Sequence, residues 1–288
     1  MSSEPHLLWP VGAALGEGPV WCADEAALRF VDIKAGKLHR FAPTTGERET
    51  REVGGLPSFI VPAADGGFLV GRGNTLRRFD GEALGETVAV IDMPHHNRTN
   101  DATVDAAGRL WFGTMDNDET VPTGALYCLD RGALRTSEWR AVVTNGPALS
   151  CDGRVLYHVD SGQRTIWRIA VSDGAVAATG EVFVRLGENE GFPDGVVVDS
   201  EDCLWVALWD GWGVRRYAPD GTLLAKISLP CARVTKLAFG GPDLRTAFVT
   251  TARVGLDEAA LTAQPLAGSL FAFTAPAPGC LVPAAILA

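Results

Sequence analysis

The stretch NDATVDAAGRLWFGTM (100–115) joins a polar opening residue, a short apolar run, a turn with Asp and Gly, and a second apolar run. This pattern returns along the whole chain, so the sequence is an internal repeat. The other copies are EGPVWCADEAALRFVDI (17–33), SFIVPAADGGFLVGRG (58–73), NGPALSCDGRVLYHVDS (145–161), DGVVVDSEDCLWVALW (194–209) and KLAFGGPDLRTAFVTT (236–251). Six copies fill nearly the entire chain and leave no linker between them.

The length and content of each copy indicate a propeller blade. The first apolar residue after the turn runs from Leu28 to Ala247 in steps of 41 to 48 residues. Each unit holds short β-branched and aromatic runs separated by Gly-containing turns, which is typical of antiparallel strands joined by hairpins. No sustained period of 3.6 residues lies between them, which argues against strand–helix alternation. We therefore predict an all-β six-bladed β-propeller, with about four antiparallel strands per blade, in one domain spanning 1–288.

Two segments lie outside the repeat. We expect the residues around 7–13 to close the ring by pairing with the last blade, whose chain runs to 271–288. The segment LDEAALTAQ (256–264) can form one or two helical turns inside a loop.

Composition restricts the class of protein. The chain has 288 residues, 47% of them hydrophobic, and a formal net charge of −10. This apolar content supports a core, and the excess of acid disfavours nucleic acid and anionic membrane surfaces as partners. No apolar run approaches the length of a membrane span, and the N-terminus lacks the pattern of a signal peptide. The six cysteines form no CxxC motif, so we expect buried free thiols and a cytoplasmic location. We further expect the protein to be a monomer.

The phase of the repeat predicts a site. The residues that open each copy occupy equivalent positions, and rotation about the ring axis would bring them together at one end of the channel. They are Glu17, Ser58, Asn100, Asn145, Asp194 and Lys236. Two carboxylates that share a shielded channel repel unless a proton or a cation neutralises one of them.

A divalent metal is one way to satisfy these residues. Carboxylate and amide oxygens favour Ca²⁺, Mg²⁺, Mn²⁺ or Fe²⁺, and Zn²⁺ is less typical without His or Cys. The alternative is that the polar residues only cap the inner strands and hydrate a water-filled channel.

Several motifs resemble those of the SMP-30/gluconolactonase/regucalcin-like family and fall in five of the six blades. They are GEGPVW (16–21), RTND (98–101) with GRLWFGTM (108–115), NGPALSCDG (145–153), PDGVVVDSEDCLWVA (193–207) and TTARVGLDEAALTAQPLAGSLFAF (250–273). The resemblance implies a six-bladed propeller with one divalent metal, held by Glu17, Asn145 and Asp194. It also implies substrate contacts at Arg98 and Asn100.

A further acidic substrate contact is implied near Asp118, but the run DNDET (116–120) leaves Glu119 as an alternative. Lys236 stands where the family usually has Ser or Thr, which indicates either a changed charge preference or a side chain that points away.

The resemblance implies hydrolysis of a sugar lactone to an aldonic acid. A metal would polarise the lactone carbonyl and stabilise the oxyanion. Asp194 could both bind the metal and accept a proton from the attacking water. The open alternatives are a propeller that binds metal without catalysis, and a hydrolase of aryl esters or organophosphates.

Other polar and aromatic residues carry weaker signals. His95 and His96 are expected in a loop near the channel mouth, and His158 in a strand as a packed residue. Most tryptophans, such as those at 21, 111, 167 and 205, are expected between blades. Trp209 and Trp212 are candidates to stack on a sugar at the mouth.

Overall fold

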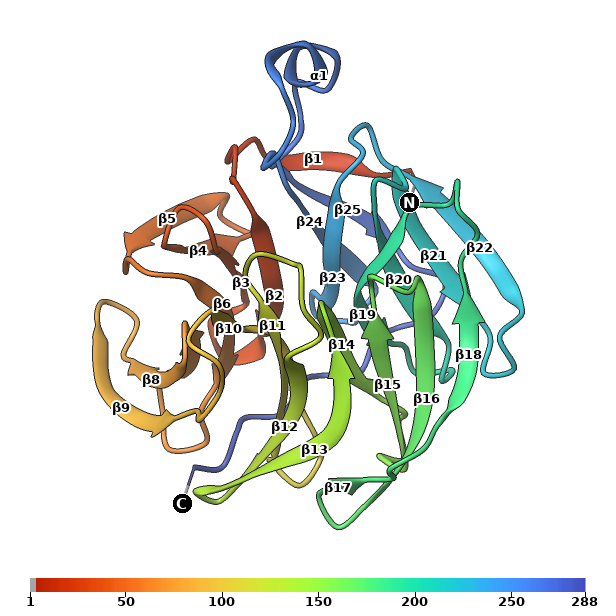
Figure 1. The fold of residues 1–288 in the computed structure, drawn as a ribbon. Coiled ribbons are helices and arrows are strands. Elements are labelled where there is room, and N and C mark those ends of the chain that lie inside the picture. The colour runs from red at the N-terminus through yellow and green to blue at the C-terminus, as the bar shows by residue number, and fades with distance from the viewer. Residues whose placement is uncertain (1–3, 288) are drawn as a thin grey trace.

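The computed structural model describes residues 4–287, which form six antiparallel sheets arranged in a ring (Figure 1). Blade one consists of β2 (Gly16–Cys22), β3 (Ala27–Asp32), β4 (Lys37–Ala42) and β5 (Glu47–Glu52). Blade two consists of β6 (Pro57–Pro62), β7 (Phe68–Arg72), β8 (Thr75–Phe79) and β9 (Leu84–Val90). Blade three consists of β10 (Asn97–Val104), β11 (Leu110–Asp116), β12 (Gly124–Asp130) and β13 (Ala133–Ala141).

Blade four consists of β14 (Thr144–Leu149), β15 (Val155–Asp160), β16 (Thr165–Ser172) and β18 (Glu181–Arg185). Blade five consists of β19 (Phe192–Val198), β20 (Leu204–Trp209), β21 (Gly213–Tyr217) and β22 (Leu223–Ser228). Blade six consists of β23 (Val234–Gly240), β24 (Thr246–Thr251), β25 (Leu270–Thr274) and β1 (His6–Trp9). The short strand β17 (Ala175–Val176) is a third partner of β16, which also pairs with β15 and β18. This is the six-bladed propeller that the repeat predicted.

The N-terminal strand closes the ring. β1 pairs with β25, with Leu7 opposite Phe271, so the first strand of the chain is the outermost strand of the last blade. The expected pairing is confirmed, although the strand ends at Trp9. The expectation that the chain ends within the last blade is wrong, because β25 ends at Thr274 and the following residues leave the sheet.

Two short helices occur outside the sheets. The helix α1 (Glu258–Ala263) lies in the loop between β24 and β25, as the sequence indicated, and the carboxylate of Asp257 caps it by accepting from Ala260 N at 2.8 Å. A 3₁₀ turn, η1 (Ala23–Glu25), joins β2 to β3. In the described part of the chain α1 is the one α-helix, and its six residues are too few to cross a bilayer.

Burial decreases from the centre of the ring to its rim. Every residue of β2 is buried, whereas the outermost strand β5, with the sequence ERETRE, has no buried residue. The apolar core therefore lies where the faces of neighbouring blades meet. Trp205 of blade five, for example, is fully buried beside Phe239 and Phe273 of blade six. Such a side chain contributes roughly 2–3 kcal/mol through burial.

An Asp and a Trp six residues later form the same contact in two blades. Asp105 accepts a hydrogen bond from Trp111 Nε1 at 3.0 Å, and Asp199 accepts one from Trp205 Nε1 at 2.8 Å. Each Asp also accepts backbone N–H groups of the turn that follows it. The repeated pair thus ties the turn after the innermost strand to the buried indole of the second strand.

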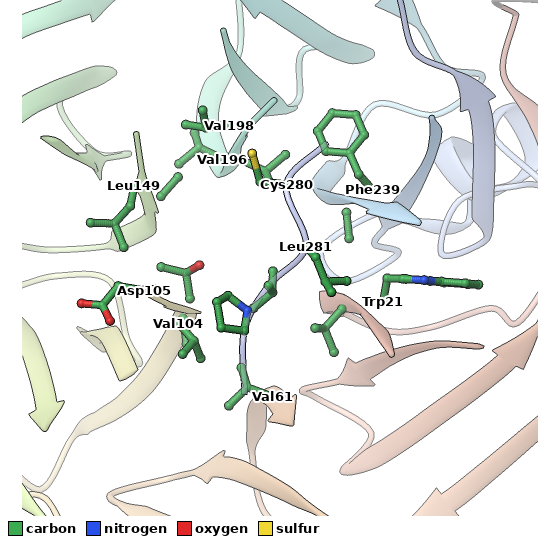
Figure 2. Close-up of a pocket in the computed structure, with 18 of the residues that line it drawn as sticks. Trp21, Val61, Val104, Asp105, Leu149, Val196, Val198, Phe239, Cys280 and Leu281 are labelled. Carbon is green, nitrogen blue, oxygen red and sulfur yellow. The ribbon is translucent and has the colours of Figure 1, made fainter. Parts of the chain in front are cut away.

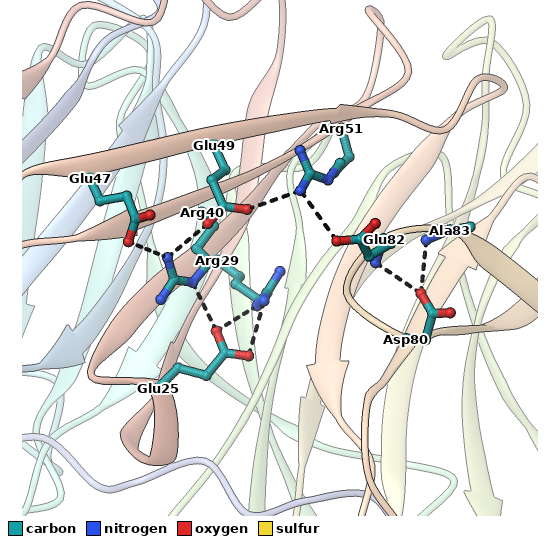
Figure 3. A network of polar contacts seen from close by, with 9 residues as sticks. All are labelled: Glu25, Arg29, Arg40, Glu47, Glu49, Arg51, Asp80, Glu82 and Ala83. Carbon is teal, nitrogen blue, oxygen red and sulfur yellow. Dashed lines mark hydrogen bonds and ion pairs between the residues drawn. The ribbon is translucent and has the colours of Figure 1, made fainter.

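A network of charged side chains covers the outside of blade one (Figure 3). Arg40 contacts Glu25, Glu47 and Glu49 at 3.0–3.2 Å. Arg51 extends the network from Glu49 to Glu82 of blade two. Exposed ion pairs of this kind contribute about 0–1 kcal/mol each to stability, so the main effect of the network is to give the rim a polar surface.

The cysteines do not all follow the expectation. Four of them, Cys22, Cys128, Cys203 and Cys231, are buried free thiols. Cys151 and Cys280 are exposed instead. They lie in the turn after β14 and in the segment after β25.

Candidate functional site

The innermost strands share a local irregularity near their starts. In β2, Glu17 pairs with Val31 and Val20 with Arg29, so two residues of β2 lie opposite one residue of β3. The innermost strands of the other five blades each contain the same kind of extra residue. A bulge bends its strand and redirects the side chains around it. Repetition of this bulge in every blade aims one set of side chains at the ring axis.

One cavity is lined by four of the six residues that the phase of the repeat selected. Its volume is about 500 Å³ and its wall includes Glu17, Asn100, Asn145 and Asp194, together with Arg98. All five of these side chains are buried. The structure therefore brings together every predicted metal ligand and both predicted contacts of the RxND motif.

The other two residues of the set, Ser58 and Lys236, do not belong to the wall of this cavity. Ser58 Oγ is 2.7 Å from Thr99 Oγ1, and Lys236 Nζ forms an ion pair with Asp101. Lys236 also donates to Ala102 O at 3.1 Å, so blade three holds its ammonium group. A Cβ on Gly195 would lie 2.5 Å from the side chain of Lys236, which explains the glycine of the PDG motif.

A chain of hydrogen bonds links the polar residues across blades three to five. Arg98 Nη1 donates to Asn100 Oδ1 at 2.6 Å. Asn100 Nδ2 donates to Asn145 Oδ1 at 2.8 Å, and Asn145 Nδ2 donates to Ser161 Oγ at 2.9 Å. Ser161 Oγ in turn donates to Pro193 O at 2.7 Å, directly before Asp194. Each amide is thus fixed in one orientation, with Asn145 Oδ1 on the side of Asn100.

Burial and neighbouring negative charge disfavour the ionised forms of Glu17 and Asp194. Burial, and then the charge of Asp101, raise the pKa of Glu17 to about 8, even though Gly18 N donates to its Oε2 at 2.7 Å. Burial, and then Glu17, raise the pKa of Asp194 well above its ordinary value. Burial also lowers the pKa of Arg98 to about 10. A divalent cation bound among these groups would relieve the repulsion between the carboxylates.

The donor set fits one hard or borderline divalent cation. No three His, Cys, Asp or Glu side chains gather in a metal-binding arrangement within residues 4–287. The available donors are therefore the carboxylates of Glu17 and Asp194 and the amide oxygen of Asn145, all of which are oxygens. Such a set suits Ca²⁺, Mg²⁺, Mn²⁺ or Fe²⁺ better than a thiol-binding metal.

The structure separates the two acidic candidates after the GTM motif. Glu119 lines the cavity, whereas Asp118 is not part of its wall. The carboxylate of Asp116 organises this loop by accepting from the backbone N–H groups of Asp118, Thr120 and Val121 at 2.8–3.1 Å. These bonds, that of Thr120 foremost, hold the pKa of Asp116 well below its usual range. The loop leaves Glu119 with a positive φ of 57°.

Several lining residues were not predicted from the sequence. They include Lys34, Ser161, Phe192 and Arg233. Lys34 and Ser161 lie just after the second strands of blades one and four. Because a second strand runs antiparallel to the first, its end lies beside the start of the first strand. The same phase argument, applied to second strands, would have found both residues.

The predicted aromatic and histidine positions differ in their outcome. Trp209 lines the cavity and lies 4.8 Å from the guanidinium carbon of Arg233. Trp212 is exposed and does not belong to the wall, nor do His95 and His96. His158 is buried, where desolvation lowers its pKa to about 4, so it is the packed residue that the sequence indicated.

Comparison with known proteins agrees with the motifs. The profile of the SMP-30/Gluconolactonase/LRE-like region matches residues 15–253. Pentonolactonase XacC of Haloferax volcanii is 40% identical over 243 residues, which cover 83% of this chain and 81% of the relative. A 6-deoxy-6-sulfogluconolactonase of Pseudomonas putida is 34% identical, with 94% of both chains covered.

A solved structure agrees over nearly the whole chain. The calcium-binding protein regucalcin from Agrobacterium tumefaciens superposes with a TM-score of 0.91 at 28% identity, covering 96% of both chains. The resemblance seen in the motifs is confirmed: the chain belongs to the SMP-30/gluconolactonase/LRE-like family.

Proposed function

We propose that this protein is a metal-dependent lactonase that opens a sugar lactone to its aldonic acid. The observation that carries the proposal is the joint placement of two buried carboxylates and the Arg98–Asn100–Asn145 hydrogen-bond chain around one cavity. Relatives named for pentonolactone and sulfogluconolactone hydrolysis support this class of substrate. The volume of about 500 Å³ leaves room for a monosaccharide lactone and water.

We assign Glu17, Asn145 and Asp194 as the residues that hold the metal. When bound there, a divalent cation would supply Lewis acidity to the lactone carbonyl and charge stabilisation to the oxyanion. Asn100 and Ser161 fix the amide of Asn145, so the orientation of its oxygen is set before any ligand arrives. This preorganisation reduces the ordering cost of forming the site.

The remaining chemistry is assigned to side chains of the cavity wall. Asp194 accepts the proton of the attacking water, because its carboxylate lines the cavity and has a second oxygen besides the one that would hold the metal. Arg98 engages Asn100 and Thr99 through Nη1, and its buried Nε has no partner among the described residues. The guanidinium can therefore donate to the lactone oxygens and bind the substrate.

The function is tested with a panel of lactones and metals. Protein stripped with a chelator is assayed for acid release from pentono- and hexonolactones in the presence of Fe²⁺, Mn²⁺, Zn²⁺, Ca²⁺ or Mg²⁺. We expect at least one pairing to exceed spontaneous hydrolysis by roughly 10⁴-fold or more. Phenyl acetate and an organophosphate triester serve as comparison substrates. Tight Ca²⁺ binding without any acceleration of lactone hydrolysis would show that the propeller binds metal without catalysis. A preference for the aryl ester would reject a sugar lactone as the substrate.

The acidic contact in the loop after β11 can be identified by paired substitutions. Since Glu119 faces the cavity, we expect Glu119→Gln to raise KM for the lactone by about tenfold, the loss of one charge-assisted hydrogen bond. Asp118→Asn should change KM by less than about twofold. Steady-state kinetics with one lactone measure both values, and a larger effect at Asp118 would reverse the assignment.

A further inference from the structure

The end of the chain crosses the channel opposite the candidate metal site. After β25, Gly279 forms a bridge with Asp199 of blade five, and Ala285 forms one with Ala63 of blade two. Ile286 N then donates to Gly108 O of blade three at 2.8 Å. We call residues 275–287 the tail. It is anchored to several blades and lies over the ends of the innermost strands, away from their bulged starts.

The tail covers a second, smaller cavity. This cavity has a volume of about 160 Å³ and an apolar wall (Figure 2). Its wall includes Trp21, Leu149 and Phe239 of the blades, and Cys280 and Leu281 of the tail. A Cβ on Gly279 would lie 2.1 Å from the side chain of Phe239, so the tail is closely seated at this point.

Two thiols meet where the tail passes blade four. Cys280 Sγ lies 3.3 Å from Cys151 Sγ, and the two residues are 129 positions apart in the sequence. Both are exposed, unlike the other four cysteines. Backbone contacts hold each side in place: Cys151 N donates to Asp202 Oδ1 at 2.7 Å, and Gly279 N donates to Leu244 O at 2.8 Å.

We propose that Cys151 and Cys280 are a disulfide-forming pair that fastens the tail to blade four when the protein is oxidised. The oxidant is a small disulfide such as glutathione disulfide. The two thiols lose two protons and two electrons as the S–S bond forms, and glutathione disulfide takes them up to become two molecules of glutathione. Reducing glutathione reverses the reaction, so the pair is a redox-sensitive modification site.

The chemistry of Cys151 sets the conditions of this reaction. Partial burial, and then contact with the thiol of Cys280, raise the pKa of Cys151 to about 12. Thiolates are the attacking species in thiol–disulfide exchange, so attack by Cys151 should be slow at neutral pH and should accelerate as the pH rises. Proximity drives the pairing: neither thiol has to move far to bond with the other.

Cross-linking should stabilise the fold without changing the candidate active site. The bond would close a loop of 129 residues and restrict the unfolded chain, which raises Tm by roughly 5–10 °C for a protein of this size. The cysteines line the covered cavity and not the wall that holds Glu17 and Asp194. Lactone turnover at moderate temperature should therefore be the same in both redox forms.

The test uses the full chain, reduced and then incubated with glutathione disulfide at pH 8.5. We expect a mass lower by two hydrogens, a proteolytic fragment that joins residues 151 and 280, and a higher Tm that dithiothreitol reverses. Cys280→Ser should lose both the bond and the Tm shift, whereas Cys128→Ala, at a buried thiol, should keep them.

Three results would overturn the proposal. The first is that both thiols remain free after oxidation, and the second is a disulfide that links other cysteines. The third is a Cys151–Cys280 bond that leaves Tm unchanged, because the tail would then not be fastened by it. The fragment map distinguishes these results without reference to lactonase activity.

Discussion

Replacing Asp194 with Asn is expected to lower kcat/KM for the lactone by about 10³-fold or more. The substitution keeps the shape of the side chain but removes a charged metal ligand and the assigned proton acceptor together. Steady-state kinetics with the preferred lactone and metal measure the loss, and the metal content of the dialysed protein measures the ligand role. Retention of a tenth of the activity would reject Asp194 as the proton acceptor, and an unchanged metal content would reject it as a metal ligand.

Loss of activity in this variant should not come from unfolding. Burial and the nearby charge of Glu17 raise the pKa of Asp194, so its ionised form is unfavourable in the metal-free fold. A neutral amide removes that cost, and the free energy of unfolding of the metal-free variant should be no lower than that of the original protein. Asp220→Asn is the matched control, because Asp220 lies in an exposed turn of the same blade. It should retain full activity.

Replacing Asp199 with Ala is expected to cost about 3–5 kcal/mol of unfolding free energy. The carboxylate is fully buried and accepts from Trp205 Nε1 and Arg216 Nε, both at 2.8 Å. Its removal leaves a buried guanidinium without this partner and an indole N–H without an acceptor. Denaturant unfolding, monitored by tryptophan fluorescence, measures the loss.

The equivalent residue in blade three provides a graded comparison. Asp105 holds Trp111 in the same way, but its arginine neighbour Arg109 is partly exposed and lies 3.6 Å away. We therefore expect Asp105→Ala to cost about 2 kcal/mol, less than Asp199→Ala. Equal losses in the two variants would show that the buried arginine adds nothing and would contradict the argument.

The fold was predictable because its information is repeated along the chain. A strand of only six or seven residues carries a weak signal, but six copies in phase reinforce one another. The same phase located Glu17, Asn145 and Asp194, since equivalent positions in a ring meet at its axis. The helix at 258–263 was also anticipated, from its own local pattern.

Features outside the repeat were harder to predict. The tail has no equivalent in the other units, so nothing in the sequence indicated that it crosses the ring. The choice between Asp118 and Glu119 depends on a loop whose path is set by side-chain bonds of Asp116. The exposure of Cys151 and Cys280 likewise depends on where the tail lies, which spacing in the sequence does not contain.

The bulge near the start of each innermost strand has a consequence for how such proteins diversify. Regular pairing is already interrupted there, so a new side chain at that place disturbs few ladder hydrogen bonds. The ring thus has one equivalent bulge position in each blade, and the side chain at that position can change while the backbone of the propeller stays the same. Lys236 illustrates this within the chain: it occupies the bulge position of blade six, where it forms an ion pair with Asp101 instead of lining the cavity. New chemistry can then arise by substituting the residues at these bulge positions one at a time.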